Sequence, residues 1–499
     1  MTLNRIRLLF LVLAAWVGSQ PLHAQFYNGS EQEFGKNRVQ YQDFLWQYYR
    51  FPELETYFYK GGKDVARYVS ISAHRNKREM EKFFDFTVDD RIQFVVYNSL
   101  GDFRQSNVGV TGDELYNIGG VTRIVGTKVF VYNEGDHQLL ERQVRSGLAQ
   151  LMIDQMMYGG NWREVLRNST LLNLPEWYTK GLVAYCSGPW DARSENRIRD
   201  GVLGTRFKRF NRLEGEDATL AGLAVWTYVA ETYGTSVIPN ILYMTRVSRN
   251  PESGFNYVLG MGLKTLTQEC LDHYRKKYAE DDRLRAEITG EPIVLKTRKN
   301  RTYSEFKLSP DGRHAAWVSN ELGQYKVWLY DRSEKKLKRL LKGEKRLNRI
   351  VDKSFPVLAW HPSGRALTWT TERKGEVFLT TYTLDDQVFT RKPVFMLEKI
   401  LSMAYSADGK NMVFSGVREG RTDLYLYFPI GNRQEQLTDD QFDDMDPAFA
   451  DGDRAILFSS DRTDDTLRPN AEVEWTSQRR DLFRYDLISR SNVLARLTN

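Results

Sequence analysis

Hydrophobic and polar residues alternate along the chain in two different ways, and the pattern changes near residue 285. Before this point, apolar residues recur at the three- and four-residue spacing of amphipathic helices. The spacing predicts helices over 63–82, 139–158, 174–187, 219–233, 235–248 and 264–279. Runs of β-branched and aromatic residues at 91–99 and 119–133 predict a buried strand and a strand pair around a glycine turn. A small sheet followed by several helices is typical of an α+β domain.

The pattern after residue 300 is that of an all-β repeat. Four segments are copies of one unit, in which a tight turn precedes a strand and a second strand follows: LSPDGRHAAWVSN, WHPSGRALTWTTE, YSADGKNMVFSGV and FADGDRAILFSSD. Their turn glycines lie 52, 45 and 43 residues apart, and an aspartate precedes three of them: Asp311 and Gly312, Gly364, Asp408 and Gly409, Asp451 and Gly452. Such a period, with room for four strands, is the signature of β-propeller blades of the WD40-like kind. We therefore expect at least four blades.

The first 24 residues have the pattern of a secretory signal peptide. Arg5 and Arg7 precede an apolar run over 8–17, and the small residue Ala24 offers a cleavage site. This run is too short to span a membrane, and no second run approaches the ~20 apolar residues that a spanning helix needs. Because no cysteine lies near the cleavage site, a bacterial lipoprotein anchor is not expected. The pattern indicates an exported protein that is soluble or peripherally attached.

The chain thus divides into five expected parts. These are a signal peptide over 1–24, an aromatic segment over 25–62 that packs on a neighbouring domain, an α+β domain over 63–285, a polar linker over 286–300 and the propeller repeats over 301–499. The final LARLTN matches the QEQLTD that precedes the turn of the fourth repeat. Either the chain is a fragment of a longer protein, or the first propeller strand closes the ring at this point.

The charge and the cysteine content of the chain argue against some classes of partner and of covalent link. The net charge of +6 comes from 71 basic and 65 acidic residues, without a dense basic block or interleaved aromatic residues, so nucleic acid is not an expected partner. The most basic run, KKLKRLLKGEKR at 335–346, is expected to be a solvated strand edge rather than a phosphate or lipid contact. Cys186 and Cys270 are expected to be buried free thiols, although an exported location permits a disulfide.

The repeats resemble the propeller repeats of TolB and related exported bacterial proteins, most closely in SPDGRHAAWVSN followed by YKVWLYD. The first domain resembles a zinc metallopeptidase of the thermolysin-like gluzincin type, found fused to such propellers in exported Bacteroidetes proteins. This second resemblance is carried by the helix at 139–158 and by four segments: FGKNRVQYQDF, VVYNSLGDFRQSNVG, LPEWYTKGLVAYCSGPWD and RIRDGV. It implies an α+β fold with a mainly helical C-terminal half.

In such peptidases two histidines four residues apart on one helix bind zinc, and the glutamate after the first histidine activates water. A glutamate on the next helix is the third ligand. The matching positions here are Ser146 for the first histidine, Gly147 for that glutamate, Gln150 for the second histidine and Lys180 for the third ligand. Serine and glutamine are poor zinc ligands, and an ammonium group repels Zn²⁺. The resemblance therefore implies a pseudopeptidase with no catalytic residue, no metal and no cofactor.

The residues around this degenerate site leave two alternatives open. Trp177, Gly181 and Tyr185 match the flanking motif and are expected to support the cleft, unless both segments are ordinary core helices. Lys180 either fills the space of the lost metal and donates hydrogen bonds to Gln150 and Ser146, or points to solvent. His137, the only histidine near the helix, is expected to be an exposed loop residue rather than a zinc ligand.

Three functions remain open on these residues. The first is a non-enzymatic envelope protein, in the periplasm or peripheral to the outer membrane, that binds or scaffolds envelope proteins or peptides through its degenerate cleft and propeller. The second is a hydrolase with unconventional ligands or with a catalytic domain beyond residue 499. The third is a glycan-binding or surface-assembly module, which the 27 Tyr and 11 Trp permit. The missing zinc ligands favour the first; the oligomeric state is undetermined.

Overall fold

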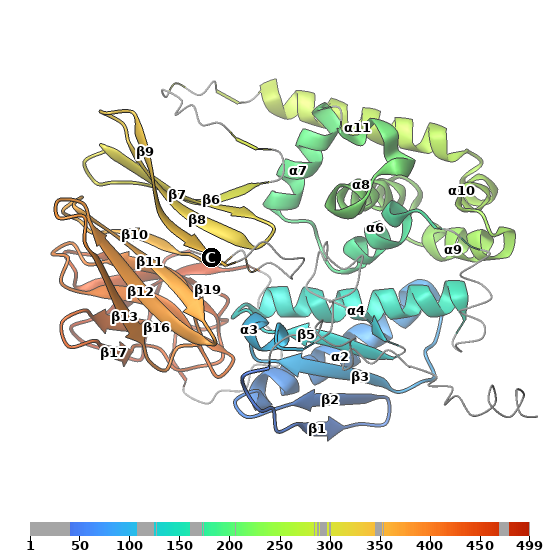
Figure 1. Cartoon of the computed structure of the whole chain (residues 1–499). Helices are drawn as coiled ribbons and strands as arrows, with labels where there is room; N and C mark the ends of the chain where they lie inside the picture. The colour runs from blue at the N-terminus through green and yellow to red at the C-terminus, as the bar shows by residue number, and fades with distance from the viewer. Residues whose placement is uncertain are drawn as a thin grey trace, which may run out of the picture.

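The computed structural model combines a helical N-terminal half, built on one sheet, with a C-terminal half made only of sheets (Figure 1). It describes residues 40–106, 124–125, 127–159, 172, 174–204, 206–283, 285–286, 289, 297–298, 301–344, 352, 354–468 and 479–498. The expected signal peptide and most of the expected linker at 286–300 lie outside these residues.

The N-terminal sheet has the order β1-β2-β3-β5-β4, with strands β1 (Gln47–Arg50), β2 (Leu54–Phe58), β3 (Ile92–Tyr97), β4 (Ile124–Val125) and β5 (Lys128–Tyr132). Its three central strands, β2, β3 and β5, are parallel, and both edge strands are antiparallel to their neighbours. The predicted strand at 91–99 is confirmed, and β4 and β5 form a strand pair within the predicted range 119–133, of which residues 119–123 and 126 lie outside the described residues. The aromatic segment at 25–62 does more than pack on a neighbour, because β1 and β2 lie within it and extend the sheet.

The helices follow the predicted order. They are α2 (Lys63–Phe84), α3 (Leu100–Phe103), α4 (His137–Tyr158), α6 (Glu176–Cys186), α7 (Ala192–Leu203), the 3₁₀ helix η2 (Arg206–Arg212), α8 (Gly215–Tyr233), α9 (Val237–Ser248), α10 (Pro251–Leu259) and α11 (Leu263–Arg283). All six predicted helices are present. The pattern missed α7, whose surface is mostly polar, and α10, which starts at Pro251 after the capping side chain of Asn250.

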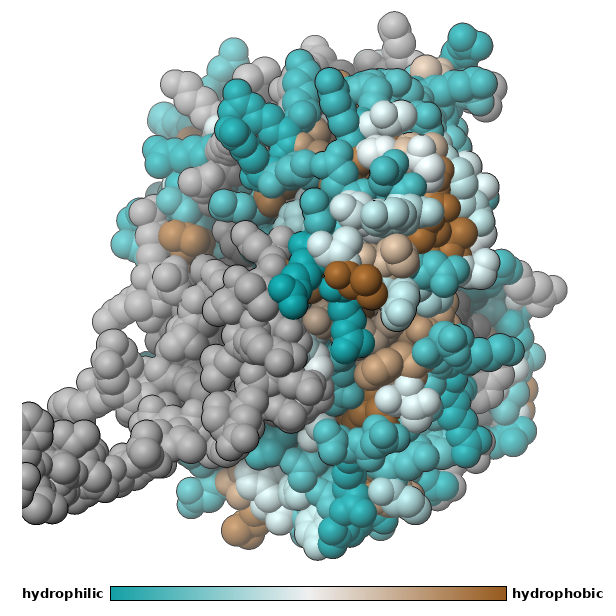
Figure 2. All heavy atoms as spheres, turned by 90° about the vertical axis from the view of Figure 1, so that its right-hand side faces the viewer, coloured by the Kyte–Doolittle hydropathy of each residue, from teal (hydrophilic) through white to brown (hydrophobic). Residues whose placement is uncertain are grey.

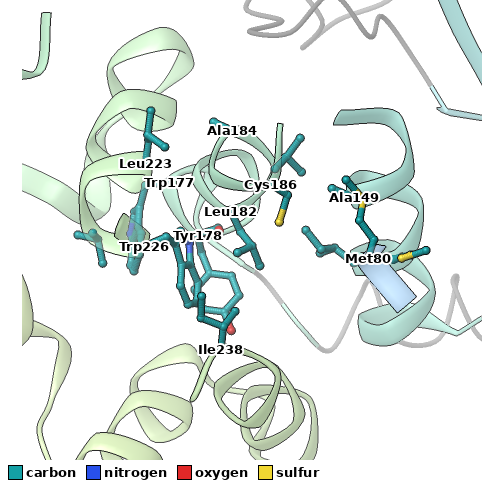
Figure 3. Close-up of a cluster of buried hydrophobic side chains, with 14 of the residues drawn as sticks. Met80, Ala149, Trp177, Tyr178, Leu182, Ala184, Cys186, Leu223, Trp226 and Ile238 are labelled. Carbon is teal, nitrogen blue, oxygen red and sulfur yellow. Dashed lines mark hydrogen bonds between the residues drawn. The ribbon is translucent and has the colours of Figure 1, made fainter. Parts of the chain in front are cut away.

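The core of the helical half centres on the crossing of α6 and α8, where the aromatic rings of Trp177, Tyr178 and Trp226 gather (Figure 3). Two hydrogen bonds order these rings: Trp226 Nε1 donates to the Tyr178 carbonyl at 2.9 Å, and the Tyr178 hydroxyl lies 2.9 Å from Thr245 Oγ1. The two helices approach closely because glycines face each other. A Cβ atom on Gly181 would lie 2.4 Å from the Gly222 Cα atom.

The C-terminal half consists of four antiparallel four-stranded sheets in chain order, as the repeats predict. Their strands are β6–β9, β10–β13, β14–β17 and β18–β21, and we call these sheets blades 1 to 4. Their bounds are β6 Thr302–Leu308, β7 His314–Glu321, β8 Gln324–Asp331, β9 Lys336–Gly343, β10 Leu358–Trp360, β11 Ala366–Arg373, β12 Glu376–Thr383, β13 Phe389–Val394, β14 Lys399–Tyr405, β15 Met412–Arg418, β16 Arg421–Phe428, β17 Arg433–Gln436, β18 Asp444–Ala450, β19 Ala455–Ser460, β20 Asp481–Asp486 and β21 Ala495–Arg496. Separate hydrophobic clusters join blade 1 to 2, 2 to 3 and 3 to 4, which is propeller-like stacking.

The face turned to the viewer in Figure 2 is mostly hydrophilic, with hydrophobic residues in small groups. The described part of the basic run forms β9, whose side chains are exposed or half-buried, as expected for a solvated strand edge. Among the described residues, no helix is both long and apolar enough to cross a membrane.

The glycine contact predicts a strong response to one methyl group. We expect Gly222→Ala to lower the free energy of unfolding by about 1–3 kcal/mol, because overpacking forces the helices apart. The added Cβ atom would lie 1.9 Å from the Trp177 carbonyl oxygen. Urea denaturation followed by circular dichroism measures this loss. Lys276→Ala, at an exposed position on α11, serves as the control, and equal stability of the two variants would contradict the prediction.

Candidate functional site

The four positions of the degenerate site lie on the helices α4 and α6. The Asp136 side chain caps α4 by accepting hydrogen bonds from the backbone N–H groups of Gln138 and Leu139. The helix α6 begins after Pro175, which fixes an extended entry. Because these caps fix the residue at which each helix begins, they also fix how far along α4 Ser146, Gly147 and Gln150 lie, and how far along α6 Lys180 lies.

The first two positions of the site are buried, and Gly147 faces the sheet. Ser146 is buried, and its hydroxyl has no hydrogen-bond partner among the described residues. A Cβ atom on Gly147 would lie 2.3 Å from the Val129 Cγ1 atom of β5. Val129 therefore fills the space into which a general-base glutamate at position 147 would have to extend.

The other two positions are engaged in local polar pairs. Gln150 Nε2 donates to Asp154 Oδ1 at 2.8 Å, one turn along α4. Burial raises the pKa of Asp154 to about 6, although the hydrogen bond from Gln150 acts in the opposite direction. Lys180 Nζ lies 2.9 Å from Glu176 Oε1 on its own helix. Among the described residues Lys180 follows neither of the two alternatives left open by the sequence, because its Nζ atom pairs with Glu176 instead of Gln150 and Ser146 and is itself buried rather than directed to solvent.

The three residues expected to support the cleft have different surroundings. Trp177 is fully buried, and its Nε1 atom donates to Asn211 Oδ1 at 3.0 Å. Gly181 permits the close crossing with α8. Tyr185, which is half-buried, lines a cavity of about 640 Å³ between α2, α4, α6 and α8. Both cysteines are free and buried, as expected. Burial raises the pKa of the Cys186 thiol to about 12, so it is a poor nucleophile.

His137 is buried rather than exposed, which corrects the expectation from sequence. It is the first residue of α4, and its ring Nδ1 lies 2.9 Å from Asp443 Oδ1 in the loop before β18. The His137 backbone N–H also donates to Asp443 Oδ2 at 2.6 Å. Burial lowers the pKa of His137, but Asp443, followed by Asp461 and Asp136, outweighs it and raises the pKa to about 9. The imidazolium thus joins α4 to blade 4.

A second buried ion pair joins the turn before α4 to blade 3. Lys399 Nζ lies 3.5 Å from Glu134 Oε1 and 3.7 Å from Asp352 Oδ2. Burial lowers the pKa of Lys399, but the two carboxylates outweigh this effect and raise it. Asn133 Nδ2 donates to the Gly420 carbonyl at 2.8 Å, and Thr422 Oγ1 donates to the Gly135 carbonyl at 2.8 Å. We call residues 133–137 and their partners in the blades the anchor.

The four repeat turns share a backbone geometry that has a structural role. The glycines at 312, 364, 409 and 452 have φ between 64° and 73°, a left-handed conformation that favours glycine. Asp311 Oδ1 accepts from the Arg313 backbone N–H at 3.0 Å, and Asp408 repeats this bond with Lys410. Asp451 departs from the pattern, since it has φ 53° and accepts from Arg484 Nε at 2.8 Å.

Within the described residues, one acidic group has the spacing of a metal site. Carboxylate oxygens of Asp423, Asp440 and Asp444 lie within 4.8 Å of one another, and all three residues are buried. Arg462 is also buried and donates to Asp440 Oδ2 at 3.0 Å and to Asp444 Oδ1 at 2.7 Å. Because this guanidinium already engages two of the three carboxylates and burial raises the pKa of the third, Asp423, well above its ordinary value, we interpret the group as a network between blades 3 and 4.

The fold therefore defines a multidomain protein with a propeller-like all-β C-terminal region and a helical N-terminal half. The C-terminal region is similar to TolB. The chain is 34% identical over 92 residues to the Tol-Pal system protein TolB of Anaeromyxobacter dehalogenans (strain 2CP-C), a match that covers 18% of this chain and 20% of that protein. The chain thus spans about a fifth of the length of this relative. No family model matches the chain.

Solved structures match a larger share of the chain, about two fifths. TolB from Acinetobacter baumannii matches 40% of this chain and 43% of its own, with 16% identity and a TM-score of 0.30. The β-propeller domain of the Trilobed protease from Pyrococcus furiosus matches 41% of this chain and 59% of its own, with 9% identity and a TM-score of 0.28. The blade architecture is established by the strand pairing itself.

Sequence reasoning missed the anchor and the cavity. Glu134, Asp352 and Lys399 are distant in sequence, and no periodicity links them. One signal was present: His137 follows Asp136, an N-cap residue, which places it on the helix rather than in a loop.

The anchor predicts a pH dependence that one substitution removes. His137 has a folded pKa of about 9, above its ordinary value of 6.5, so its contribution to stability is complete below pH 6.5 and is lost as pH rises through 9. We expect His137→Gln to lower the free energy of unfolding most at pH 6 and much less at pH 10. The loss at pH 6 should be about 3–5 kcal/mol, because Asp443 is left buried without its partner.

Urea titrations at pH 6, 8 and 10 measure this difference for the full chain. His273→Gln, at an exposed position on α11, is the control and should show no comparable trend. A stability difference for His137→Gln that is constant from pH 6 to pH 10 would contradict the assignment.

Proposed function

We propose that this chain is an exported, non-enzymatic protein of the cell envelope that binds other proteins, and that its helical half is a gluzincin-like domain without zinc chemistry. The packing of Val129 against Gly147 carries this proposal, because it leaves no room for a general base where the motif requires one. Gln150 and Lys180 add to it, since each forms a pair with an acid on its own helix.

The propeller supports the proposed binding role. Blades present turns and strand edges on a rigid frame, an arrangement that suits protein partners. The matched relative is by its name a protein of the Tol-Pal system, and this supports an envelope location and envelope partners for the present chain. The anchor holds the helical half on the blades, so a partner would meet both parts as one surface.

Metal content tests the loss of zinc chemistry. After exposure of the purified chain to Zn²⁺ and dialysis, we expect elemental analysis to find far less than one zinc per chain, and no cleavage of a fluorogenic peptide mixture. One zinc per chain, with peptide cleavage that chelation abolishes, would overturn the proposal.

A further inference from the structure

The cavity between α2, α4, α6 and α8 is a separate feature from the degenerate site. Its volume of about 640 Å³ lies in the range of small-molecule sites, and its lining includes Phe83, Tyr185, Trp190 and Leu223. None of the four degenerate positions belongs to this lining. Figure 3 shows Leu182 and Cys186 of α6 pointing towards the side of Met80 and Ala149, and Met80 and Cys186 contribute to the lining.

One side of the cavity is aromatic. The rings of Phe83 and Tyr185 lie 6.2 Å apart between centroids, and Trp190 lies on the loop after α6. Aromatic faces accept hydrocarbon chains and also attract cations through the ring quadrupole. Trp190 already shows this attraction, because Lys277 Nζ lies 5.6 Å from its ring centroid while it pairs with Glu195.

The charges of the lining favour a cation. Arg145 is the only basic residue of this lining, and two of its three guanidinium nitrogen atoms are engaged: Nε donates to the Cys186 carbonyl at 3.0 Å, and Nη1 bonds Asn76. Its Nη1 atom lies 3.1 Å from Glu79 Oε2, which neutralises one carboxylate.

Glu231 is the second carboxylate of the lining, and it has no hydrogen bond or ion pair with another described residue. Glu231 is close enough to act on the aromatic side of the cavity. The pKa of Tyr185 is raised by burial first, and then by the Cys186 thiol and by Glu231. An anionic ligand would be repelled by Glu231, and a neutral ligand would cover this carboxylate without pairing it, which is unfavourable.

We propose that this cavity binds a primary ammonium group on an apolar stem, with Glu231 as the charge partner and the Phe83–Tyr185 side as the contact for the stem. Both a lysine side chain and the amino terminus of a peptide have this chemistry. The site is independent of the degenerate zinc positions, so it holds whether or not those positions bind metal.

Isothermal titration of the full chain with three probes tests the proposal. N-acetyl-lysine amide carries the side-chain ammonium, phenylalanine amide carries the amino-terminal ammonium, and N-acetyl-phenylalanine amide is the neutral analogue. We expect at least one ammonium probe to bind, and the neutral analogue to bind about tenfold more weakly or not at all. The probe that binds more tightly identifies the source of the ammonium group.

Glu231→Gln should weaken the ammonium probe about tenfold, because a charge-assisted contact becomes a neutral one. This residue is exposed, so the variant is expected to fold, and its circular dichroism melting curve verifies this. Glu280→Gln, at an exposed position on α11 outside the cavity, is the matched control and should leave the Kd unchanged. Failure of both ammonium probes to bind, equal binding of the neutral analogue, or an unchanged Kd for folded Glu231→Gln would overturn the proposal.

Discussion

The structure depends on the buried charges of the anchor, which fix the start of α4 against two blades. Lys399 meets the carboxylates of Glu134 and Asp352, and His137 meets Asp443. Buried ion pairs of this kind add little net stability, since desolvation offsets their attraction, but they tolerate few geometries. The anchor therefore acts mainly on specificity: it selects one arrangement of the helical half on the blades.

The helix α4 transmits this constraint into the helical half. Its first turn belongs to the anchor, its middle packs on β5 through Gly147, and its Arg145 bonds the end of α6. The helix α6 in turn crosses α8 at Gly181. These close contacts leave little freedom for side chains at the degenerate positions, yet they leave the cavity behind Arg145 and Tyr185 open. The proposed loss of zinc chemistry and the proposed ligand cavity are thus compatible in one scaffold.

Much of the fold could be predicted from local pattern, because helices and repeated strands carry their periodicity in adjacent residues. The six predicted helices and the four blades are present where apolar spacing and turn glycines indicated them. The candidate site was predicted less well. Lys180 pairs with Glu176 instead of Gln150, since a partner one turn away on the same helix is nearer than one on α4. The reason for a glycine at position 147 could not be predicted from the sequence, because it depends on the contact with Val129, which only the fold brings near.

The sequence by itself determined most of the helices and strands, the blade repeat and the residue types at positions 146, 147, 150 and 180. These properties depend on residue type and on short-range spacing, which the printed sequence contains. Only the tertiary structure decided which distant charges meet. Asp443 reaches His137 across 306 residues, and Glu231 reaches the wall formed by Phe83 and Tyr185, because packed helices and blades bring them together. No local pattern encodes such contacts, since they arise from the whole fold at once.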